Sequence, residues 1–385
     1  MPTKHYTYGG STAGRTMNCP AWRLLSKRVP RPTEGAEVSN IFADDGTLKH
    51  NCMERLMTED IEYSDLLGDT YKDQVVTQEM IDDVLVPTWE AYEKFADEHN
   101  FITDLAEYEV FIDEEIGGTA DILAFNDDTV FIGDFKFGFN LVHPEENPQG
   151  LFYAMCGREM DSLKEVFKGR ENVCIFIAQP QYAEQGDEII QVWFTTTERL
   201  NDFMDDYLTA IENENVELPI AGEHCKYCPA MVVCPIKTGA ARQALMLDPK
   251  SEDAATLSKA LGMANEVIEW AKAVQVFAHE QASQGLKLEG YKLVDKRATR
   301  KWSDEKAVLD MVRKARKIKL EEATDIKLKS APQLEKLFKK KDLDFSKYDA
   351  YIEAVSSGTT LVKADDKRPE ALCLQALIAT VNSNS

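Results

Sequence analysis

Apolar and β-branched residues gather into short runs in the middle of the chain. Two of these runs, at 119–125 and 129–135, are separated by only three polar residues, a pattern typical of a β-hairpin. An apolar run at about 105–112 precedes them, and the runs VCIFIAQP and EIIQVWFTT follow them. We therefore expect three antiparallel strands followed by two more strands.

Segments with helical periodicity flank these strands. We expect a first helix in IFADDGTLKHNCMERLM, capped by Asp45 or Thr47. A second helix is expected at about 78–98, where Pro87 kinks or splits it. Two more helices are expected, one from Pro148 onward and one at about 197–213. The order is helix, helix, three strands, helix, strand, strand, helix. This order predicts a mixed α/β core with helices on its faces.

The composition changes after residue 236. Residues 237–252 are a plausible linker, and a long helix with an apolar stripe is expected at about 253–284. Further on, the sequence predicts a basic strand and several short helices. We therefore expect a domain at 1–236, a linker at 237–252 and a mostly helical module at 253–385.

The expected hairpin brings chemically useful side chains to one of its ends. Asp121 lies near the start of the first run and Asp134 near the end of the second, so antiparallel pairing places the two carboxylates together. Asp134 and Lys136 share one face by strand alternation. Two carboxylates can bind Mg²⁺ or Mn²⁺, and a lysine can position the attacking water in metal-assisted phosphodiester cleavage. Such residues at strand ends are also commonly solvated, so the surrounding motifs must decide.

Two pairs of helix residues extend this candidate site. His50 and Glu54 lie four residues apart on one face of the first helix, and His50 could add a nitrogen ligand to the same metal. Gln149 and Tyr153 have the same spacing near the start of the later helix, where they could contact a phosphate or a base. The alternatives are a structural or surface histidine and a partly buried polar pair.

Eight cysteines in an intracellular chain indicate metal binding or free thiols rather than disulfides. Three of them have the spacing C-x2-C-x5-C, at Cys225, Cys228 and Cys234. Cys19, which also precedes a proline, is the best candidate for a fourth ligand. Such a cluster would join the two ends of the domain. Iron–sulfur and zinc remain alternatives, because C-x2-C suits both. Cys52 and Cys174 are expected to be buried small hydrophobic residues.

The net charge of −23 argues against a protein that coats nucleic acid over its whole surface. Residues 291–341 differ, because Lys and Arg outnumber Asp and Glu there by 17 to 8. This region could guide a polyanion, dock a partner protein or form a solvated helical face. The candidate DNA contacts are Lys296, Arg297, Arg300 and Lys301. No apolar run is long enough to cross a membrane, so we expect a soluble, cytoplasmic protein without membrane partners.

Four motifs, in this order, resemble the PD-(D/E)XK nucleases and specifically their RecB-like exonuclease branch. They are Gly46-Thr47-x-x-His50-x-x-x-Glu54, Gly118-Thr119-Ala120-Asp121, Asp134-Phe135-Lys136 and Gln149-x-x-x-Tyr153. The four cysteines resemble the iron–sulfur clasp of some members of that branch. The whole chain resembles a phage or prophage family of RecB-like nucleases, in which S-x-x-x-R-x-x-x-C-P and D-K-R-P recur, compared with Ser11, Arg15, Cys19, Pro20 and residues 366–369. Ala120 stands where the motif name has proline.

The resemblance implies a restriction-endonuclease-like core with a mixed sheet flanked by helices. It also implies a metal-dependent DNA exonuclease, which could have endonuclease activity as well. His50, Asp121, Asp134 and the carbonyl of Phe135 would then hold Mg²⁺ or Mn²⁺, and Lys136 would assist the water. Gln149 and Tyr153 would hold the substrate strand.

The resemblance also implies that Glu54 belongs to the catalytic set, orienting His50, and that a structural 4Fe-4S cluster joins the four cysteines. The setting would be phage DNA replication, recombination or repair in the cytoplasm of a bacterial host. The partners would be DNA and a replication or recombination protein, such as a single-strand-binding or annealing protein. A non-catalytic DNA- or protein-binding adaptor that retains the nuclease fold is the alternative.

Overall fold

The computed structural model describes residues 6–30, 41–184, 186–226, 228–246, 254–283, 286–292, 338 and 344–346. The chain divides into two compact units, Met1–Val294 and Asp295–Ser385. The fold described below belongs to the first unit. The predicted basic strand and the short helices after it lie outside the described residues, as do Lys296, Arg297, Arg300 and Lys301.

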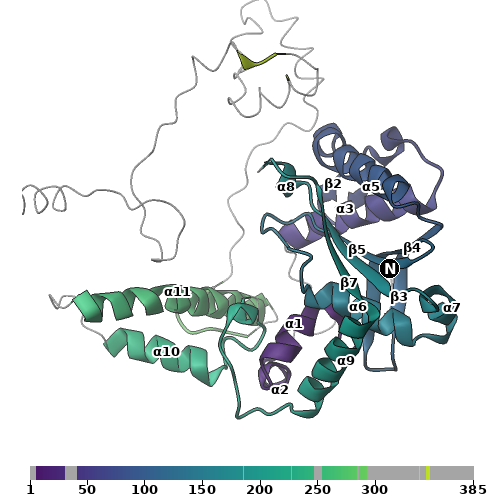
Figure 1. Ribbon diagram of the computed structural model, residues 1–385. Coiled ribbons are helices and arrows are strands. Elements are labelled where there is room, and N and C mark those ends of the chain that lie inside the picture. Colours follow the sequence, from purple (N-terminus) through teal and green to yellow (C-terminus); the bar gives the residue numbers. More distant parts are fainter. Residues whose placement is uncertain are drawn as a thin grey trace, which may run out of the picture. The chain divides into compact units, whose positions relative to one another are not determined.

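A mixed five-stranded sheet forms the centre of the first unit (Figure 1). Its strands, which follow one another in the order of the chain, are β3 (Thr103–Phe111), β4 (Gly117–Phe125), β5 (Thr129–Phe135), β6 (Asn172–Ala178) and β7 (Ile190–Thr196). All neighbours pair antiparallel except β5 and β6, which are parallel. The expected hairpin, its three antiparallel strands and the two later strands are confirmed.

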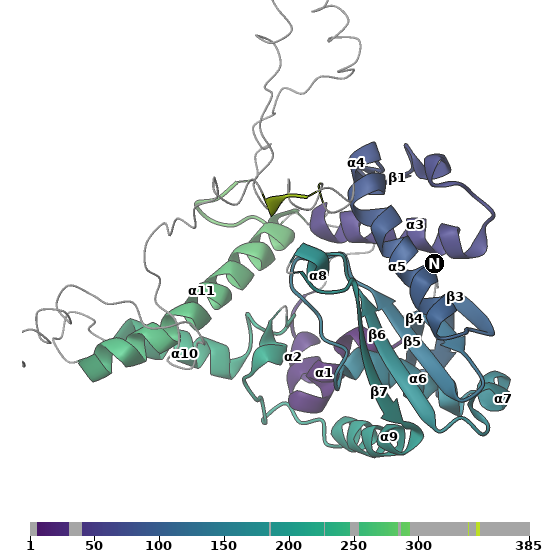
Figure 2. The ribbon, with the colours of Figure 1, turned by 45° about the horizontal axis from the view of Figure 1, so that its top comes forward.

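Helices cover both faces of the sheet (Figures 1 and 2). One face packs against α1 (Gly10–Asn18), α6 (Pro148–Glu159) and α9 (Thr197–Glu212), and the other against α3 (Ile41–Thr58) and α5 (Val86–Glu98). Alternate residues of a strand enter opposite cores: Leu123 faces the first set of helices and Ile122 the second. Every residue of β5 is buried, because both of its faces are covered.

Shorter elements complete the first unit. They are α2 (Trp22–Ser26), η1 (Tyr63–Leu66), β1 (Thr70–Tyr71), β2 (Gln74–Val75), α4 (Gln78–Met80), η2 (Ile81–Leu85), η3 (Asp161–Leu163), α7 (Lys164–Phe167), α8 (Gln181–Glu184) and η4 (Glu223–Cys225). The helix expected at 78–98 is thus divided by the single π-helical turn η2, and Pro87 lies just after this turn, in the first turn of α5. Cys52 and Cys174 are buried, as expected.

The start of α3 differs from the expectation. The helix begins at Ile41, so Asp45 and Thr47 lie inside it and do not cap it. The Thr47 hydroxyl donates to the carbonyl of Ala43 one turn earlier, and Asp45 pairs with Lys49 one turn later. Both polar side chains therefore find partners within a continuing helix.

The segment expected to be a linker is mostly helical. Residues 237–246 belong to α10 (Pro235–Met246), whose alanine-rich sequence favours a helix. It packs against α11 (Ala254–Ser283), and Lys237 contacts Glu266 at 3.3 Å. The long expected helix is confirmed, but Leu257 and Ile268 of its apolar stripe remain 53% and 50% exposed. Both helices belong to the first unit, which ends at Val294.

No helix in the described ranges combines the length and the apolar character needed to cross a lipid bilayer.

Candidate functional site

The open end of the β4–β5 hairpin carries the two expected carboxylates. Ile122 pairs with Gly133, so the next position of the register brings Asp121 opposite Asp134. Oδ2 of Asp121 accepts a hydrogen bond from the backbone N–H of Phe135 at 2.8 Å and lies 3.3 Å from Nδ1 of His50. The hairpin and α3 therefore bring three of the expected side chains together.

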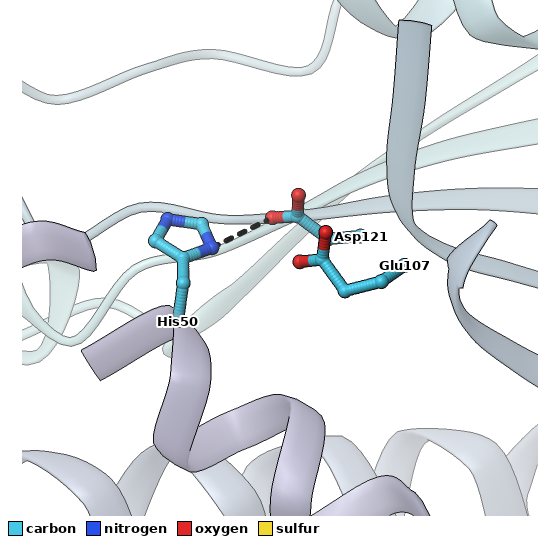
Figure 3. A group of neighbouring side chains, drawn as sticks. All are labelled: His50, Glu107 and Asp121. Atoms are coloured by element: carbon cyan, nitrogen blue, oxygen red, sulfur yellow. Dashed lines mark ion pairs between the residues drawn. The ribbon is translucent and has the colours of Figure 1, made fainter. Parts of the chain in front are cut away.

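A third carboxylate, which the sequence analysis missed, joins this group. Glu107 lies on β3 beside Asp121, and His50 points toward the same place from α3 (Figure 3). The ladder between β3 and β4 pairs Ala106 with Ile122 and Tyr108 with Ala120, which leaves Glu107 facing Asp121 without a ladder pair. The backbone of Glu107 has a φ of 46°, a sparsely populated region for a residue other than glycine. Such local strain is common at functional sites.

Asp134 belongs to a second group of contacts on the same sheet edge. Its Oδ2 lies 2.5 Å from Nζ of Lys136. Gln149 of α6 accepts from Lys136 at 3.1 Å, and its Nε2 lies 3.3 Å from both Oδ1 of Asp134 and the hydroxyl of Tyr153. The first turns of α6, which begins at Pro148 and is capped by Asn147, thus place both expected polar residues next to the hairpin.

Burial and charge give these groups unequal affinities for protons. Burial raises the pKa of Asp134 to about 6; the Lys136 ammonium opposes this rise and the Asp121 carboxylate adds to it. Burial also raises the pKa of Glu107 to about 7, again with help from the charge of Asp121. In Asp121 the charge and hydrogen bond of His50 outweigh burial and hold its pKa below the usual range. Asp121 is therefore the carboxylate that stays ionised most readily.

The donor set at this end of the hairpin fits a small divalent metal ion. One ligand atom each from His50, Glu107 and Asp121 lies within 4.8 Å of the other two. Ligands on opposite sides of an octahedral Mg²⁺ with bonds of about 2.1 Å are about 4.2 Å apart, so one ion would need these atoms at or slightly inside this limit of 4.8 Å. Oδ2 of Asp134 is buried and faces the Lys136 ammonium. A carboxylate has further lone pairs, so Asp134 could bind a metal while it keeps this ion pair.

The four candidate cysteines line one cavity. Cys19 follows α1 directly and Cys225 ends η4, and both are buried. All four are free thiols. Among the described residues, the set His50–Glu107–Asp121 is the only one whose three ligand atoms lie within 4.8 Å, so no three of these sulfur atoms are that close. Sulfur ligands of one zinc ion, with bonds of about 2.3 Å, would be about 3.8 Å apart.

Contacts between distant segments build this cavity. Nε of Arg15 on α1 donates to the carbonyl of His224, the residue before Cys225, at 3.3 Å. Arg23 of α2 forms an ion pair with Glu214, in which both partners are at most 18% exposed. The N-terminal helices are therefore tied to the segment that carries the cysteine triplet.

Residues 5–369 match the model of a family described as "Protein of unknown function (DUF2800)". The chain belongs to this family. The matched range includes the hairpin and the four cysteines and ends at Pro369. The candidate metal site and the cysteine cavity of this chain therefore both lie within the matched residues.

One expected contact of this DUF2800 protein is not formed. His50 and Glu54 share a face of α3, but no hydrogen bond or ion pair links these two described side chains; Nδ1 of His50 faces Asp121 instead. Glu54 acts at longer range, because its charge contributes to the raised pKa of Glu107. Its orienting role stays a prediction.

The ring of Tyr153 is set by close packing against two glycines. A Cβ at Gly10 would lie 2.5 Å from the Tyr153 ring, and one at Gly118 would lie 3.0 Å from it. The motif glycine before Asp121 therefore makes room for the tyrosine.

Gly10→Ala is expected to lower the free energy of unfolding by about 1–3 kcal/mol, because the added methyl group must displace the buried Tyr153 ring. Gly46→Ala is the matched control. A Cβ there meets nothing within 4 Å in the middle of α3, so it should raise stability by about 0.5–1 kcal/mol. Urea unfolding of both variants measures the two effects. Equal stability of the two variants would contradict the packing described for Tyr153.

Proposed function

We propose that this protein is a metal-dependent DNA exonuclease of the RecB-like PD-(D/E)XK type, with endonuclease activity as an addition. The observation that carries the proposal is one continuous arrangement at the hairpin end. A histidine and two carboxylates offer ligand atoms within 4.8 Å of one another, and beside them a third carboxylate, Asp134, contacts a lysine and a glutamine. Mg²⁺ or Mn²⁺, when bound, would neutralise charge on the phosphate and lower the pKa of a bound water.

The side chains of the chain divide the remaining work. Asp121, Asp134 and His50 hold the metal with the Phe135 carbonyl, and Glu107 adds an oxygen ligand on the β3 side. Lys136, which Asp134 and Gln149 keep in place, is positioned to orient a water or to offset phosphate charge. Gln149 and Tyr153 lie beside it to hold the strand being cut.

The proposal includes a structural 4Fe-4S cluster at Cys19, Cys225, Cys228 and Cys234. All four cysteines line one cavity, and their sulfur atoms are spread more widely than those around a single zinc ion. The cluster would tie the two ends of the domain together. Zinc remains the competing metal.

The resemblance to phage nucleases supports a role in phage DNA replication, recombination or repair, in the cytoplasm of a bacterial host. The charge of residues 291–341 supports DNA contact through Lys296, Arg297, Arg300 and Lys301, or docking of a single-strand-binding or annealing protein.

Lys136→Met is expected to leave the fold and metal binding in place and to reduce DNA cleavage by about 10²–10⁴-fold, because the positioned ammonium is lost. The full-length protein, purified without oxygen, would be incubated with end-labelled DNA and Mg²⁺, Mn²⁺ or EDTA. Mn²⁺ affinity is measured alongside by calorimetry. Lys94→Met, which removes a lysine that is 67% exposed on α5, is the matched control and should cleave like the wild type.

The nuclease proposal fails if the folded wild-type protein binds Mn²⁺ but leaves every DNA substrate intact. In that case the adaptor alternative takes its place. Cleavage by Lys136→Met at the wild-type rate would instead remove this lysine from the mechanism.

A further inference from the structure

An exposed aromatic ring follows directly on the candidate site. Phe139 is 81% exposed and lies three residues beyond Lys136. Two residues before it, Phe137 is buried, and its ring lies edge-on to that of His50 with centroids 5.3 Å apart. Two residues of chain span at most about 7 Å, so the backbone of Phe139 lies within about 7 Å of that of Phe137, whose ring contacts His50.

The loop that carries Phe139 is fixed by a fully buried amide. Gln179, which directly follows β6, donates to the carbonyls of Gly138 at 2.7 Å and Asn140 at 3.0 Å, and accepts from the N–H of Val142 at 3.0 Å. The hydroxyl of Tyr182 donates to the carbonyl of Val142 at 3.0 Å. Buried hydrogen bonds of this kind are costly to leave unmade, so the backbone around Phe139 is held in one conformation.

A further contact joins this loop to the cysteine segment. Nζ of Lys226, which lies between Cys225 and Cys228, donates to the Asn140 side chain at 3.3 Å. The loop is therefore supported from the sheet edge and from the segment of the cysteine cavity.

Because the Phe139 side chain is exposed to solvent, it does not pack in the described core. A flat aromatic ring on a fixed support is, however, the usual platform for a nucleic-acid base, because every base has a π-face. In a duplex the faces of a base are already covered by its neighbours, whereas a single strand leaves them free to stack on protein. An exposed aromatic ring of this kind therefore favours single-stranded over double-stranded DNA.

We propose that Phe139 stacks on an unpaired base and that the site takes single-stranded DNA. This inference rests on the proposed nuclease function and deepens it by naming the substrate form. Gln179 acts as a positioning residue, since it holds the loop without reaching the strand.

Binding of fluorescently labelled oligodeoxynucleotides tests the inference in full-length Lys136→Met protein with Mn²⁺, so that the strand binds but is not cut. A single strand should bind more tightly than the duplex of the same sequence. Phe139→Ala should weaken single-strand binding by about 5–150-fold, and Phe139→Trp should restore it. Phe194→Ala removes an aromatic side chain that is 51% exposed on β7, and it should change nothing.

A strand that carries 2-aminopurine reports stacking directly. Its fluorescence should fall when the strand binds the protein that keeps Phe139 or the Phe139→Trp variant, and it should stay higher with Phe139→Ala. Equal affinity of the Phe139 and Phe139→Ala proteins, or tighter binding of the duplex, overturns the inference.

A parallel cleavage assay separates this inference from the nuclease proposal. Metal-dependent cleavage that Phe139→Ala leaves unchanged on single strands keeps the nuclease function and removes the role of Phe139. Stacking of a bound strand without any cleavage by the wild type keeps the role of Phe139 and removes the nuclease function.

Discussion

Asp134→Asn is expected to abolish metal-dependent DNA cleavage, with a loss of at least about a thousandfold, while the protein stays folded. The metal supplies several kcal/mol of charge stabilisation in phosphodiester hydrolysis, and each 1.4 kcal/mol is about tenfold in rate. Asparagine keeps the shape of the side chain and can still meet Gln149, but it removes the buried carboxylate charge that a metal would need.

Two measurements on the same preparations check this result. Mn²⁺ should raise the melting temperature of the wild type and have little effect on Asp134→Asn, because only the wild type keeps the full ligand set. Cleavage of end-labelled DNA gives the change in rate. Asp161→Asn, which alters a side chain that is 90% exposed, is the matched control and should behave like the wild type in both assays. Wild-type cleavage by Asp134→Asn would show that the metal lies elsewhere.

Cys19→Ala should remove the iron and lower the free energy of unfolding by at least about 3 kcal/mol, since the cluster closes a loop of about two hundred residues and its binding energy adds to folding. For a domain of this size the melting temperature should fall by roughly 6–12 °C. Iron, acid-labile sulfide and zinc would be measured in protein purified without oxygen.

Cys174→Ala separates loss of the cluster from loss of packing. Cys174 is fully buried in β6, on the sheet face that packs against α3 and α5. Its replacement should lower stability through a cavity but leave the iron content unchanged. If the wild type contains stoichiometric zinc and Cys19→Ala loses it, the four cysteines form a zinc site rather than an iron–sulfur cluster. Unchanged metal content in Cys19→Ala would exclude this cysteine as a ligand.

The two candidate centres are connected through the loop that carries Phe139. Lys226 of the cysteine segment contacts Asn140, and Phe137 of the same loop contacts His50. Loss of the cluster would therefore loosen one support of the loop, while the buried hydrogen bonds of Gln179 would remain.

Local patterns in the sequence were sufficient for the strands, most helices and the hairpin end of the site. Apolar runs separated by turn residues define β4 and β5, and a period of two residues determines which side chains share a face. Asp121 and Asp134 meet because a tight hairpin has only one register that keeps its apolar residues buried. Gln149 and Tyr153 are near one another because four residues make about one helical turn.

Only the tertiary structure revealed the partners that lie far apart in the chain. Glu107 joins the site because β3 pairs with β4, and its acidic side chain alone resembles any other surface glutamate. A signal was present in the register, since Glu107 lies opposite Asp121 once β3 and β4 are aligned.

Gln179 holds a loop about 40 residues earlier in the chain, and α10, which includes residues 237–246, packs against α11. Periodicity reports which face of an element is buried, whereas the neighbour that covers this face is decided by contacts between distant segments. For this protein the sequence was therefore enough to determine the strands, most helices and the candidate chemistry, and the fold alone decided which groups surround the candidate metal site and which loop lies beside it.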